Sequence, residues 1–473
     1  MSLPDLGVGL VHLPGLEALF RRVRPAMDVI EVEPQTFWSH LPSAGAGSEA
    51  FRVNRDVLER ARRIDLPLLV HSIGFPVGGW QDGDRRHLAA LRETFSILRP
   101  AWWSEHLSFV AVHAGGKKRH LGFLMPPVQS GASIAVIVDR IQRLQDEFGL
   151  PFAFETGVNY LQPRAGEIPD GAFWGEIADR ADCGILLDLH NIWANGLNGR
   201  PGLAQVADRL PLDRVWEVHL AGGQWHKGYW LDSHSGLPPE ELIDAASHLA
   251  PRLPALHAIL LEIIPDQIEA RKIGEDEIAA CLARLRCIWG TRGSAAAPAT
   301  RRAPVARETD ALPAMEDWEV GLEAAVRRAD AGASRRFEGD PGLEIYRDLI
   351  AMVRRGTVVE ALPLTMRYLR RGLGEAGLDR AFAGFWRRCA PEPFMSEEAR
   401  NFGEFVRMKV ALPHLDEVMA FELAGHRAAI TGQPQYVTFT CAPEPVLSAL
   451  KHGAPLEFAP MRAEVEVTPP AGA

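Results

Sequence analysis

Short apolar runs alternate with amphipathic stretches over the first 290 residues of the chain. Eight of the runs have the continuous hydrophobicity of strands that are buried on both faces of a parallel sheet. They lie at residues 5–10, 28–33, 66–73, 102–109, 151–156, 183–190, 214–220 and 257–264. Apolar positions recur with helical spacing between them, at residues 54–63, 84–98, 132–148 and 239–250. Eight alternating strand and helix units predict an α/β fold of the (β/α)8 TIM-barrel type.

An open, doubly wound sheet is the alternative to the barrel. Nucleotide-binding versions of that sheet carry GxGxxG directly after an early strand, or GxxxxGK[ST] between a strand and a helix. No GxGxxG follows an early strand of this sequence, and GxxxxGK[ST] is absent. The barrel is therefore the favoured prediction.

One segment interrupts the globular pattern, at about residues 290–314. It reads GTRGSAAAPATRRAPVARETDALPA, which is rich in Ala, Pro, Arg and Thr and has no apolar periodicity. Such a composition is typical of a linker. The sequence thus predicts a barrel domain at 1–290, a linker at 291–314, and a smaller, mainly α domain with a short β tail at 315–473.

The composition restricts which binding partners and which cellular compartment we expect for the protein. The 473 residues include 51 Lys and Arg against 61 Asp and Glu, a formal net charge of −10. Broad nucleic-acid binding needs a basic face, so we expect no nucleic-acid partner. No apolar run reaches the roughly 18–20 residues that span a bilayer, and the start lacks a secretory signal pattern. Five scattered Cys without a CxxC pair predict reduced thiols in a cytoplasmic protein that binds no membrane.

Ionisable side chains end the predicted strands one after another, and in a barrel these ends converge on one mouth. A single such residue is most often a core histidine or a helix cap, but seven successive strands repeat the pattern. The candidates are Glu31, Glu33, His71, Glu105, His106, Glu155, Asp188, His190, Asn191, His219, Asp232, His234 and Glu262. Burying so many carboxylates without cations costs several kcal/mol for each unpaired charge. Mixed imidazole and carboxylate groups suit Fe, Zn or Mn, and their number predicts two or three ions.

Seven motifs carry a family resemblance, in this order: HSIGFPVGG, WSEHLSF, FETGVN, LLDLHNIWAN, EVHLAGG, DSH and LLEI. Together they resemble the multinuclear non-haem iron-dependent oxidative enzymes, a barrel family that modifies ribosomally made peptides, as in methanobactin biosynthesis. The resemblance implies two or three irons in mixed Fe(II) and Fe(III) states, with O2 as co-substrate. It implies oxidation of a peptide side chain, usually Cys and in some members Asp or Asn.

The resemblance also implies the roles of individual residues. The iron-ligand positions of the family correspond to His71, His106, Glu155, Asp188, Asn191, His219, Asp232, His234 and Glu262. Glu155 is placed to bridge two ions. The candidate catalytic residues are Glu155, Glu105 and His190, and His190 also suits a role in orienting the ligands.

The rear domain resembles the helical partner proteins that are encoded beside these oxidases and help to recognise the precursor peptide. Residues 315–430 have helical patterns, and short strands follow from residue 435. An edge strand in the tail could receive a peptide by β-augmentation. Basic pairs at Arg354–Arg355 and Arg370–Arg371 indicate either solvated helix faces or a docking surface for an acidic leader peptide. The chain then joins an oxidase to its recognition domain in cis, and the sequence sets no oligomeric state.

Two other functions fit the same residues. The first is a metal-dependent hydrolase or isomerase of the xylose isomerase and endonuclease IV type, which would work with Zn or Mn and without O2. The second is a non-catalytic iron-binding scaffold in a modification complex. Loss of peptide modification in a folded Glu155→Ala variant would separate an enzyme from a scaffold.

Overall fold

The computed structural model describes residues 3–13, 15–41, 50–114, 116–295, 312–328 and 331–469. Most of the predicted linker, residues 296–311, lies outside the described residues. The chain forms two compact units. The first contains residues 1–38, 57–112 and 124–345, and the second contains 39–56, 113–123 and 346–473.

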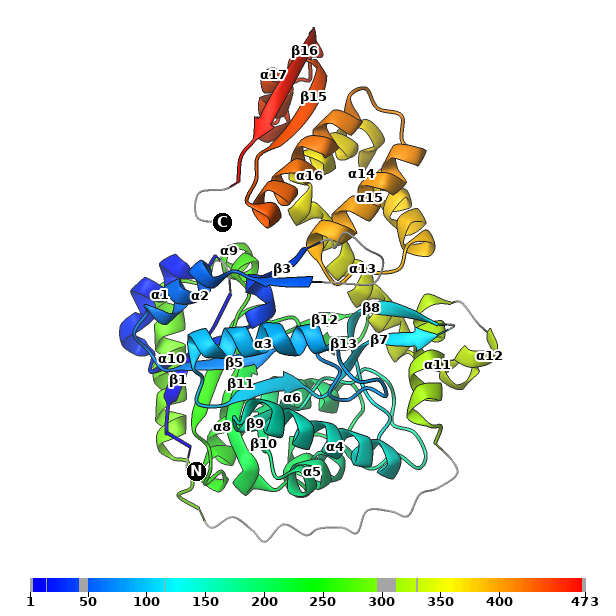
Figure 1. The fold of residues 1–473 in the computed structure, drawn as a ribbon. Coiled ribbons are helices and arrows are strands. Elements are labelled where there is room, and N and C mark those ends of the chain that lie inside the picture. Colours follow the sequence, from blue (N-terminus) through cyan, green and yellow to red (C-terminus); the bar gives the residue numbers. More distant parts are fainter. Residues whose placement is uncertain are drawn as a thin grey trace. The chain divides into compact units, whose positions relative to one another are not determined.

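A closed barrel of eight parallel strands forms the centre of the first unit (Figure 1). The strands are β1 (Gly7–His12), β2 (Val29–Val32), β5 (Leu68–Ser72), β6 (Trp103–His106), β9 (Phe152–Glu155), β10 (Gly184–Asp188), β11 (Val215–Ala221) and β14 (Ala258–Glu262). They neighbour one another in chain order, and β14 closes the ring against β1. Each overlaps one of the eight predicted strands, so the TIM-barrel prediction is confirmed. Their residues are almost all buried because the sheet is covered on both sides.

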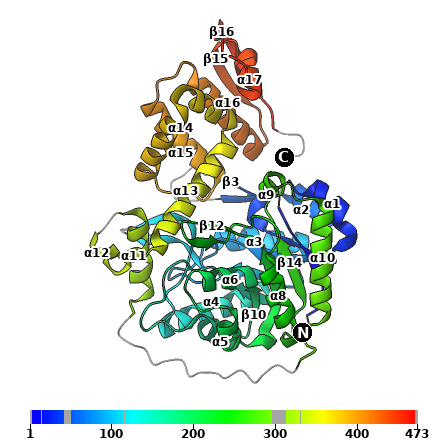
Figure 2. The same cartoon turned by 180° about the vertical axis from the view of Figure 1, so that it is seen from behind.

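Helices and short 3-10 turns connect the barrel strands. They are α1 (Glu17–Val23), η1 (Arg24–Ala26), η2 (Pro34–Phe37), α2 (Arg55–Arg62), α3 (Arg85–Leu98), α4 (Gly131–Phe148), α5 (Asp170–Ala181), α6 (Leu189–Leu197), α7 (Leu203–Ala207), η3 (Leu212–Arg214), α8 (Glu240–Leu249), η4 (Ala250–Arg252), α9 (Pro265–Arg271) and α10 (Glu275–Gly290). From behind, α8 and α10 lie on the outside of β14 (Figure 2). The helices begin at local signals: the side chain of Asp84 caps α3, and Ser130 with Ser133 forms a capping box at α4.

Three hairpins depart from the plain strand–helix alternation. They are β3 (Trp38–Leu41) with β4 (Ala50–Val53), β7 (Phe109–Ala114) with β8 (Lys117–Met125), and β12 (Gln224–His226) with β13 (Tyr229–Leu231). The basic run at residues 117–119, which the pattern places in a solvated loop, belongs instead to β8. Lys117 and Lys118 are nevertheless exposed, so their solvation is as expected.

The segment after the predicted linker divides between the two units. Helix α11 (Met315–Arg327), α12 (Ala331–Ser334) and η5 (Arg335–Phe337) belong to the barrel unit. There the indole N–H of Trp318 donates to the carbonyl of Pro126 at 3.0 Å, and Arg164 pairs with Asp340 at 3.0 Å. The compact units therefore differ from the chain division at residue 315, because side-chain contacts and not the linker decide where these helices pack.

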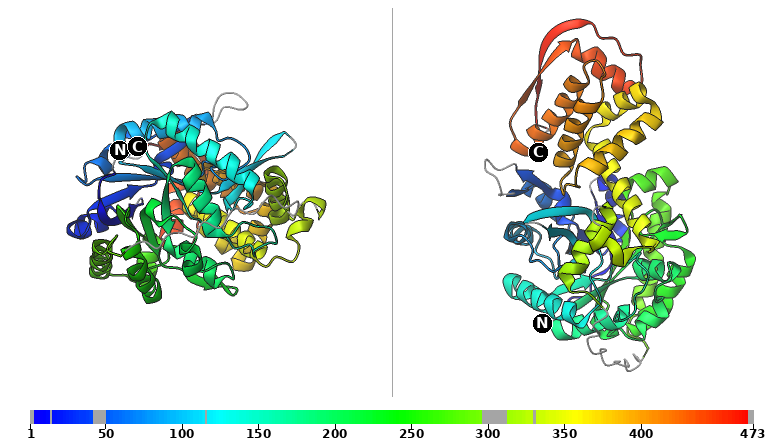
Figure 3. Two further views of the ribbon diagram at one scale, coloured as in Figure 1. Left: turned by 90° about the horizontal axis from the view of Figure 1, so that it is seen from below. Right: turned by 90° about the vertical axis from the view of Figure 1, so that its right-hand side faces the viewer.

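The second unit is mainly helical and has its own apolar core. Its elements include α13 (Gly342–Ala361), α14 (Pro363–Arg388), α15 (Met395–Lys409), α16 (Leu415–Thr431), β15 (Gln435–Cys441), α17 (Pro443–His452) and β16 (Pro460–Val467). The strands β15 and β16 pair as an antiparallel hairpin, coloured orange to red in Figure 3. Helix α14 bends at Gly374, whose φ of +67° favours glycine. The predicted helices and the short β tail are thus confirmed.

The basic pairs of the second unit are already engaged. Buried Arg354 pairs with Glu398 at 2.6 Å, and Arg355 pairs with Asp379 at 2.7 Å. In the second pair, Arg370 binds Glu375 at 2.6 Å and Arg371 donates to the carbonyl of Ala454. These contacts favour a structural role for the four arginines over an open basic docking surface. No helix in the described part of the chain is long and apolar enough to cross a membrane.

Candidate metal centre

The register of the barrel strands brings the predicted ligands side by side. His106 lies opposite Glu155 in the β6–β9 pair, and Asp188 lies opposite His219 in the β10–β11 pair. Both pairs sit at the carboxyl ends of their strands, as does Glu262 on β14. Because parallel strands end at the same mouth, residues that are 49 and 31 positions apart in the chain become neighbours.

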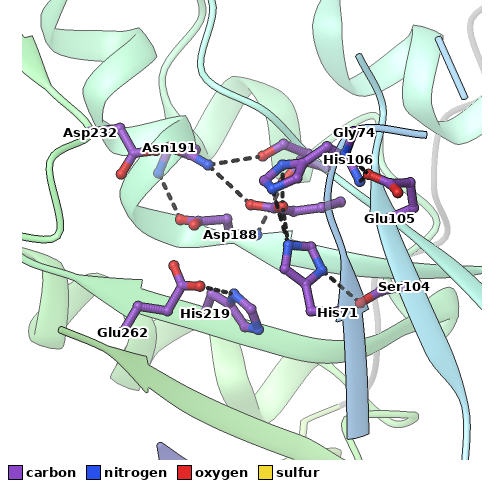
Figure 4. Close-up of polar contacts among 12 residues, drawn as sticks. His71, Gly74, Ser104, Glu105, His106, Asp188, Asn191, His219, Asp232 and Glu262 are labelled. Atoms are coloured by element: carbon purple, nitrogen blue, oxygen red, sulfur yellow. Dashed lines mark hydrogen bonds and ion pairs between the residues drawn. The ribbon is translucent and has the colours of Figure 1, made fainter. Parts of the chain in front are cut away.

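The first group contains His71, His106 and Glu155. One carboxylate oxygen of Glu155, Oε2, lies 3.1 Å from Nε2 of His71 and 2.5 Å from Nδ1 of His106. The two rings meet edge to face, with 3.1 Å between their Nε2 atoms (Figure 4). On its other side, Nδ1 of His71 bonds the hydroxyl of Ser104 at 2.8 Å, which fixes the ring. One ligand atom from each member lies within 4.8 Å of the others, close enough to hold one metal ion.

Glu155 belongs to a second group as well, with Asp188 and His219. Its other oxygen, Oε1, accepts a hydrogen bond of 3.2 Å from the side-chain amide of Asn191. Asp188 caps α6 by accepting the backbone N–H of Asn191 at 2.8 Å. The start of α6 therefore holds Asp188 and Asn191 beside Glu155, and Glu155 is shared by two groups, as expected of a bridging carboxylate.

A third group lies around His219 and includes a residue outside the ligand set that the resemblance implied. His219 Nδ1 lies 3.2 Å from Glu262, and its Nε2 lies 2.9 Å from Glu31. All three residues could hold one ion. A further buried carboxylate, Glu217, is 3.6 Å from Nε2 and accepts the indole N–H of Trp102.

Asp232 and His234 join the cluster from the loop after β13. Nε2 of His234 lies 3.0 Å from Asp232 and 3.1 Å from Glu262. All nine predicted ligands therefore meet at one mouth of the barrel. Glu33 faces the same region, where burial and the nearby charge of Glu262 raise its pKa to about 7.

His190 is held between two neighbours that fix its proton. The indole N–H of Trp230 donates to Nε2 of His190 at 2.9 Å. Since an indole nitrogen can only donate, Nε2 is an acceptor and the ring proton sits on Nδ1. Nδ1 lies 3.2 Å from Asp232, so His190 donates to that carboxylate. His190 thus orients Asp232.

The side chain of Glu105 points away from the cluster of predicted ligands. Its carboxylate accepts the backbone N–H groups of Gly74 at 3.1 Å, Phe75 at 3.1 Å and His106 at 3.0 Å. Figure 4 shows it turned toward Gly74 and away from the ring of His71. Side chains alternate along a strand, so Glu105 and His106 must point to opposite sides. The geometry makes Glu105 an anchor for the loop after β5.

Several buried polar atoms in this cluster have no hydrogen-bond partner. Within the described residues, they include Glu31 Oε2, Asp188 Oδ2 and Asn191 Oδ1. Orphaned buried atoms are rare because each costs about 1–3 kcal/mol. Here their lone pairs converge, which is the arrangement that metal ions satisfy.

Charge balance supports the same conclusion. The largest contributions to the shifted pKa values of the cluster carboxylates come from burial and from neighbouring imidazole and carboxylate groups, and no Lys or Arg is among them. Burial and Glu217 raise the pKa of Glu31, and burial and Glu155 raise that of Asp188. The pKa of His106 is raised to about 9, because the charge of Glu155 outweighs the opposing effect of burial. The imidazole and carboxylate donors fit ions such as Fe, Mn or Zn.

Sequence reasoning underrated three supporting residues. Glu217 precedes His219 by two positions, and the period of a strand puts both on one face, so alternation alone could have found it. Trp230 stood among many tryptophans without a distinguishing signal. Ser104 could not be identified because a serine that supports a ligand has no characteristic spacing in the sequence.

The fold and the site together define a TIM barrel with clustered candidate metal ligands at the carboxyl ends of its strands. The family model described as "RiPP precursor modification enzyme MbnB/TglH/ChrH" matches residues 6–276. The chain belongs to this family, whose members are enzymes that modify ribosomally made precursor peptides. The family resemblance expected from the seven motifs is thereby confirmed.

Curated relatives carry less specific names. A UPF0276 protein of Anaeromyxobacter sp. strain Fw109-5 is 34% identical over 214 residues, which cover 45% of this chain and 73% of the relative. A UPF0276 protein of Streptomyces avermitilis is 28% identical over 350 residues, covering 72% of this chain and 68% of the relative. Among solved structures, a D-psicose 3-epimerase of Clostridium cellulolyticum H10 covers 60% of this chain and 99% of its own, with 11% identity and a TM-score of 0.39. A similarity that low has no bearing on function.

Proposed function

We propose that this protein is an iron- and O2-dependent enzyme that oxidises a side chain of a ribosomally made precursor peptide. Cys is the expected target, with Asp or Asn as the other side chains that the family resemblance implies. The observation that carries the proposal is the position of Glu155. Its carboxylate lies between the pair His71–His106 and the pair Asp188–His219, and its Oε2 lies 3.1 Å from Nε2 of His71 and 2.5 Å from Nδ1 of His106.

Nine residues would hold the iron. They are His71, His106, Glu155, Asp188, Asn191, His219, Asp232, His234 and Glu262, and Glu31 lies 2.9 Å from Nε2 of His219, where it supports that ring. Two or three irons bound there would supply Lewis acidity toward a substrate thiolate or carboxylate, and electrons for the reduction of O2.

The remaining residues keep these ligands in place. Ser104 bonds His71, and His190 donates its Nδ1 proton toward Asp232 while Trp230 holds its other nitrogen. Glu105 anchors the backbone at Gly74, directly after the strand that carries His71. Such supporting contacts orient the ligands.

The loop after β5 is also secured from the outside. The guanidinium of Arg140, on α4, donates to the backbone carbonyls of Pro76, Val77, Gly79 and Trp80. Because Arg140 is buried, these bonds are shielded from water and hold the HSIGFPVGG segment in one conformation.

The test combines metal analysis with peptide mass spectrometry. The full chain, loaded with Fe(II) without oxygen, is given O2 and the peptide encoded next to its gene. We expect a mass change in the peptide that requires both iron and O2, and that is lost in Glu155→Gln. The control is Glu240→Gln, which removes an exposed carboxylate that pairs with Arg284 on the barrel surface. Full turnover without iron would refute the proposal, and turnover with Zn or Mn in the absence of O2 would indicate a hydrolase or isomerase.

Peptide recognition by the second unit is a separate part of the proposal. It is supported by the β15–β16 hairpin, whose strand β16 is largely exposed along its length. An added peptide strand would pair with the backbone of β16. Hydrogen exchange of the full chain tests this: peptide binding should slow the amides of residues 460–467. Protection confined to the barrel unit would refute it.

A further inference from the structure

A second cluster of potential ligands lies in the helical unit, apart from the barrel residues described above. It contains His414 at the start of α16, Glu417 in the first turn of that helix, and Cys441 at the end of β15. One ligand atom from each lies within 4.8 Å of the others. The thiol of Cys441 is almost fully buried, whereas His414 and Glu417 are partly exposed.

One carboxylate oxygen of Glu417 lies near three potential hydrogen-bond donors. Its Oε2 lies 3.1 Å from the backbone nitrogen of Thr440, 3.2 Å from Nδ1 of His414 and 3.6 Å from the sulfur of Cys441. A carboxylate oxygen has two lone pairs, and the backbone N–H of Thr440 uses one of them. The imidazole and the thiol, which is a weak donor, compete for the other, although Nδ1 of His414 has a second neighbour in the hydroxyl of Thr440 at 3.2 Å.

A cation would resolve this competition. Placed between the nitrogen, the oxygen and the sulfur, it turns Nδ1 of His414 into a donor of electrons and replaces the proton of the Cys441 thiol. We infer that His414, Glu417 and Cys441 form a binding site for a divalent cation of the Zn2+ type. A set of one nitrogen, one oxygen and one sulfur suits Zn2+ better than Mg2+ or Ca2+, which prefer oxygen alone.

The geometry requires only a small adjustment. Tetrahedral Zn2+ with its usual bond lengths holds its ligand atoms about 3.3–3.8 Å apart. Oε2 of Glu417 already lies 3.2 Å from Nδ1 of His414 and 3.6 Å from the sulfur of Cys441, close to this range, and the third separation is no more than 4.8 Å. Three protein ligands leave a fourth position for water, and the ring of Phe458 stacks on His414 at 4.8 Å and limits its movement.

A nucleophilic role for Cys441 fits the contacts less well. A reactive cysteine needs an imidazole or another cation beside its sulfur. Here the sulfur contacts the carboxylate of Glu417, and burial together with that charge raises the pKa of the thiol. A metal ion would instead tie α16 to β15 and so brace the hairpin of this unit.

Cobalt provides a selective probe, because the barrel cluster contains only nitrogen and oxygen ligands. Co2+ is titrated into the metal-free full chain, and the near-ultraviolet thiolate-to-Co2+ charge-transfer band is recorded. We expect a band that saturates at one thiolate per chain and disappears on addition of equimolar Zn2+. Cys441→Ser should abolish it, whereas Cys287→Ser, which removes the exposed thiol of the barrel unit, should leave it unchanged.

A second variant guards against misfolding of Cys441→Ser. His414→Ala alters a partly exposed ligand and keeps the thiol, and we expect it to weaken Co2+ binding at least tenfold. Thermal unfolding of each metal-free variant establishes that it is folded. No charge-transfer band in the wild-type chain, or a band that persists in Cys441→Ser, would overturn the inference, as would unchanged affinity in His414→Ala. None of these results depends on iron or on the peptide, so the proposed oxidase function is tested separately.

Discussion

Replacing Glu31 by Gln tests whether the centre depends on a residue outside the ligand set of the resemblance. Nε2 of His219 lies 2.9 Å from a carboxylate oxygen of Glu31, and its Nδ1 lies 3.2 Å from a carboxylate oxygen of Glu262. One ring nitrogen binds one metal, so an ion shared with Glu262 through Nδ1 leaves Nε2 to Glu31. A carboxylate at this distance from Nε2 raises the basicity of His219.

The expected loss follows from the burial of both partners. Glu31 and His219 are fully buried, so water cannot replace the lost charge. Loss of a carboxylate behind a metal-binding histidine costs about 10–100-fold in metal affinity, or about 1.4–2.8 kcal/mol. Gln keeps the shape and removes a negative charge from a cluster that lacks Lys or Arg, so the metal-free fold should be no less stable.

The assay is an anaerobic titration of the metal-free chain with Fe(II), or with Mn(II) as a redox-inert substitute. Glu217→Gln is the matched control, since Glu217 is equally buried but 3.6 Å from Nε2 and already accepts the N–H of Trp102. We expect a smaller loss there than in Glu31→Gln. Equal affinities for Glu31→Gln and the wild-type chain would refute the reasoning, as would a Glu217→Gln loss of the same size.

Three further predictions concern the supporting residues. Trp230→Phe removes the donor that fixes the proton of His190, so metal affinity should fall about 3–10-fold in the same titration; an unchanged affinity would show that the tautomer of His190 does not matter. In Arg140→Lys, the lysine cannot bond all the loop carbonyls that the guanidinium reaches, so the free energy of unfolding measured in urea should fall by about 2–3 kcal/mol. A loss of less than about 0.5 kcal/mol would count against the anchoring role. Burial raises the pKa of Glu319, which accepts the backbone N–H of Trp80, to about 7. The folded chain therefore holds this proton more tightly than the unfolded chain, and its free energy of unfolding falls as the pH rises from about 4.5 to 7. Glu319→Gln should raise the free energy of unfolding by up to about 3 kcal/mol at pH 8 and by almost nothing at pH 4.5. A gain that does not change with pH would contradict this.

The predicted ligands came from the ends of the strands, and their approach to one another could be anticipated from the barrel alone. His106 and Glu155 illustrate this, because each ends an apolar run and their strands pair in register. Glu105 illustrates the limit. Its position in the WSEHLSF motif suggests chemistry, but the alternation of β6 turns it to the loop backbone at Gly74. A motif records which residues occur together, whereas the side of the strand decides what each one touches.

The division of the chain shows a similar limit. Residues 290–314 have linker composition, and this feature is local enough to be read directly from the sequence. The packing of the helices that follow the linker depends on residues far away in the chain. Helix α11 joins the barrel unit through Trp318 and Glu319, whose partners lie near residues 126 and 80.

The sequence by itself determined the eight strands, the barrel, the family and the nine residues that cluster at the barrel mouth, because period, composition and motif order are properties of neighbouring residues. Only the tertiary structure decided that Glu31 faces His219, that Trp230 fixes the proton of His190, and that Cys441 meets Glu417. These contacts join residues 24 to 188 positions apart. Their geometry depends on strand register and helix packing, which minimise the energy of the whole fold and leave no local mark in the chain.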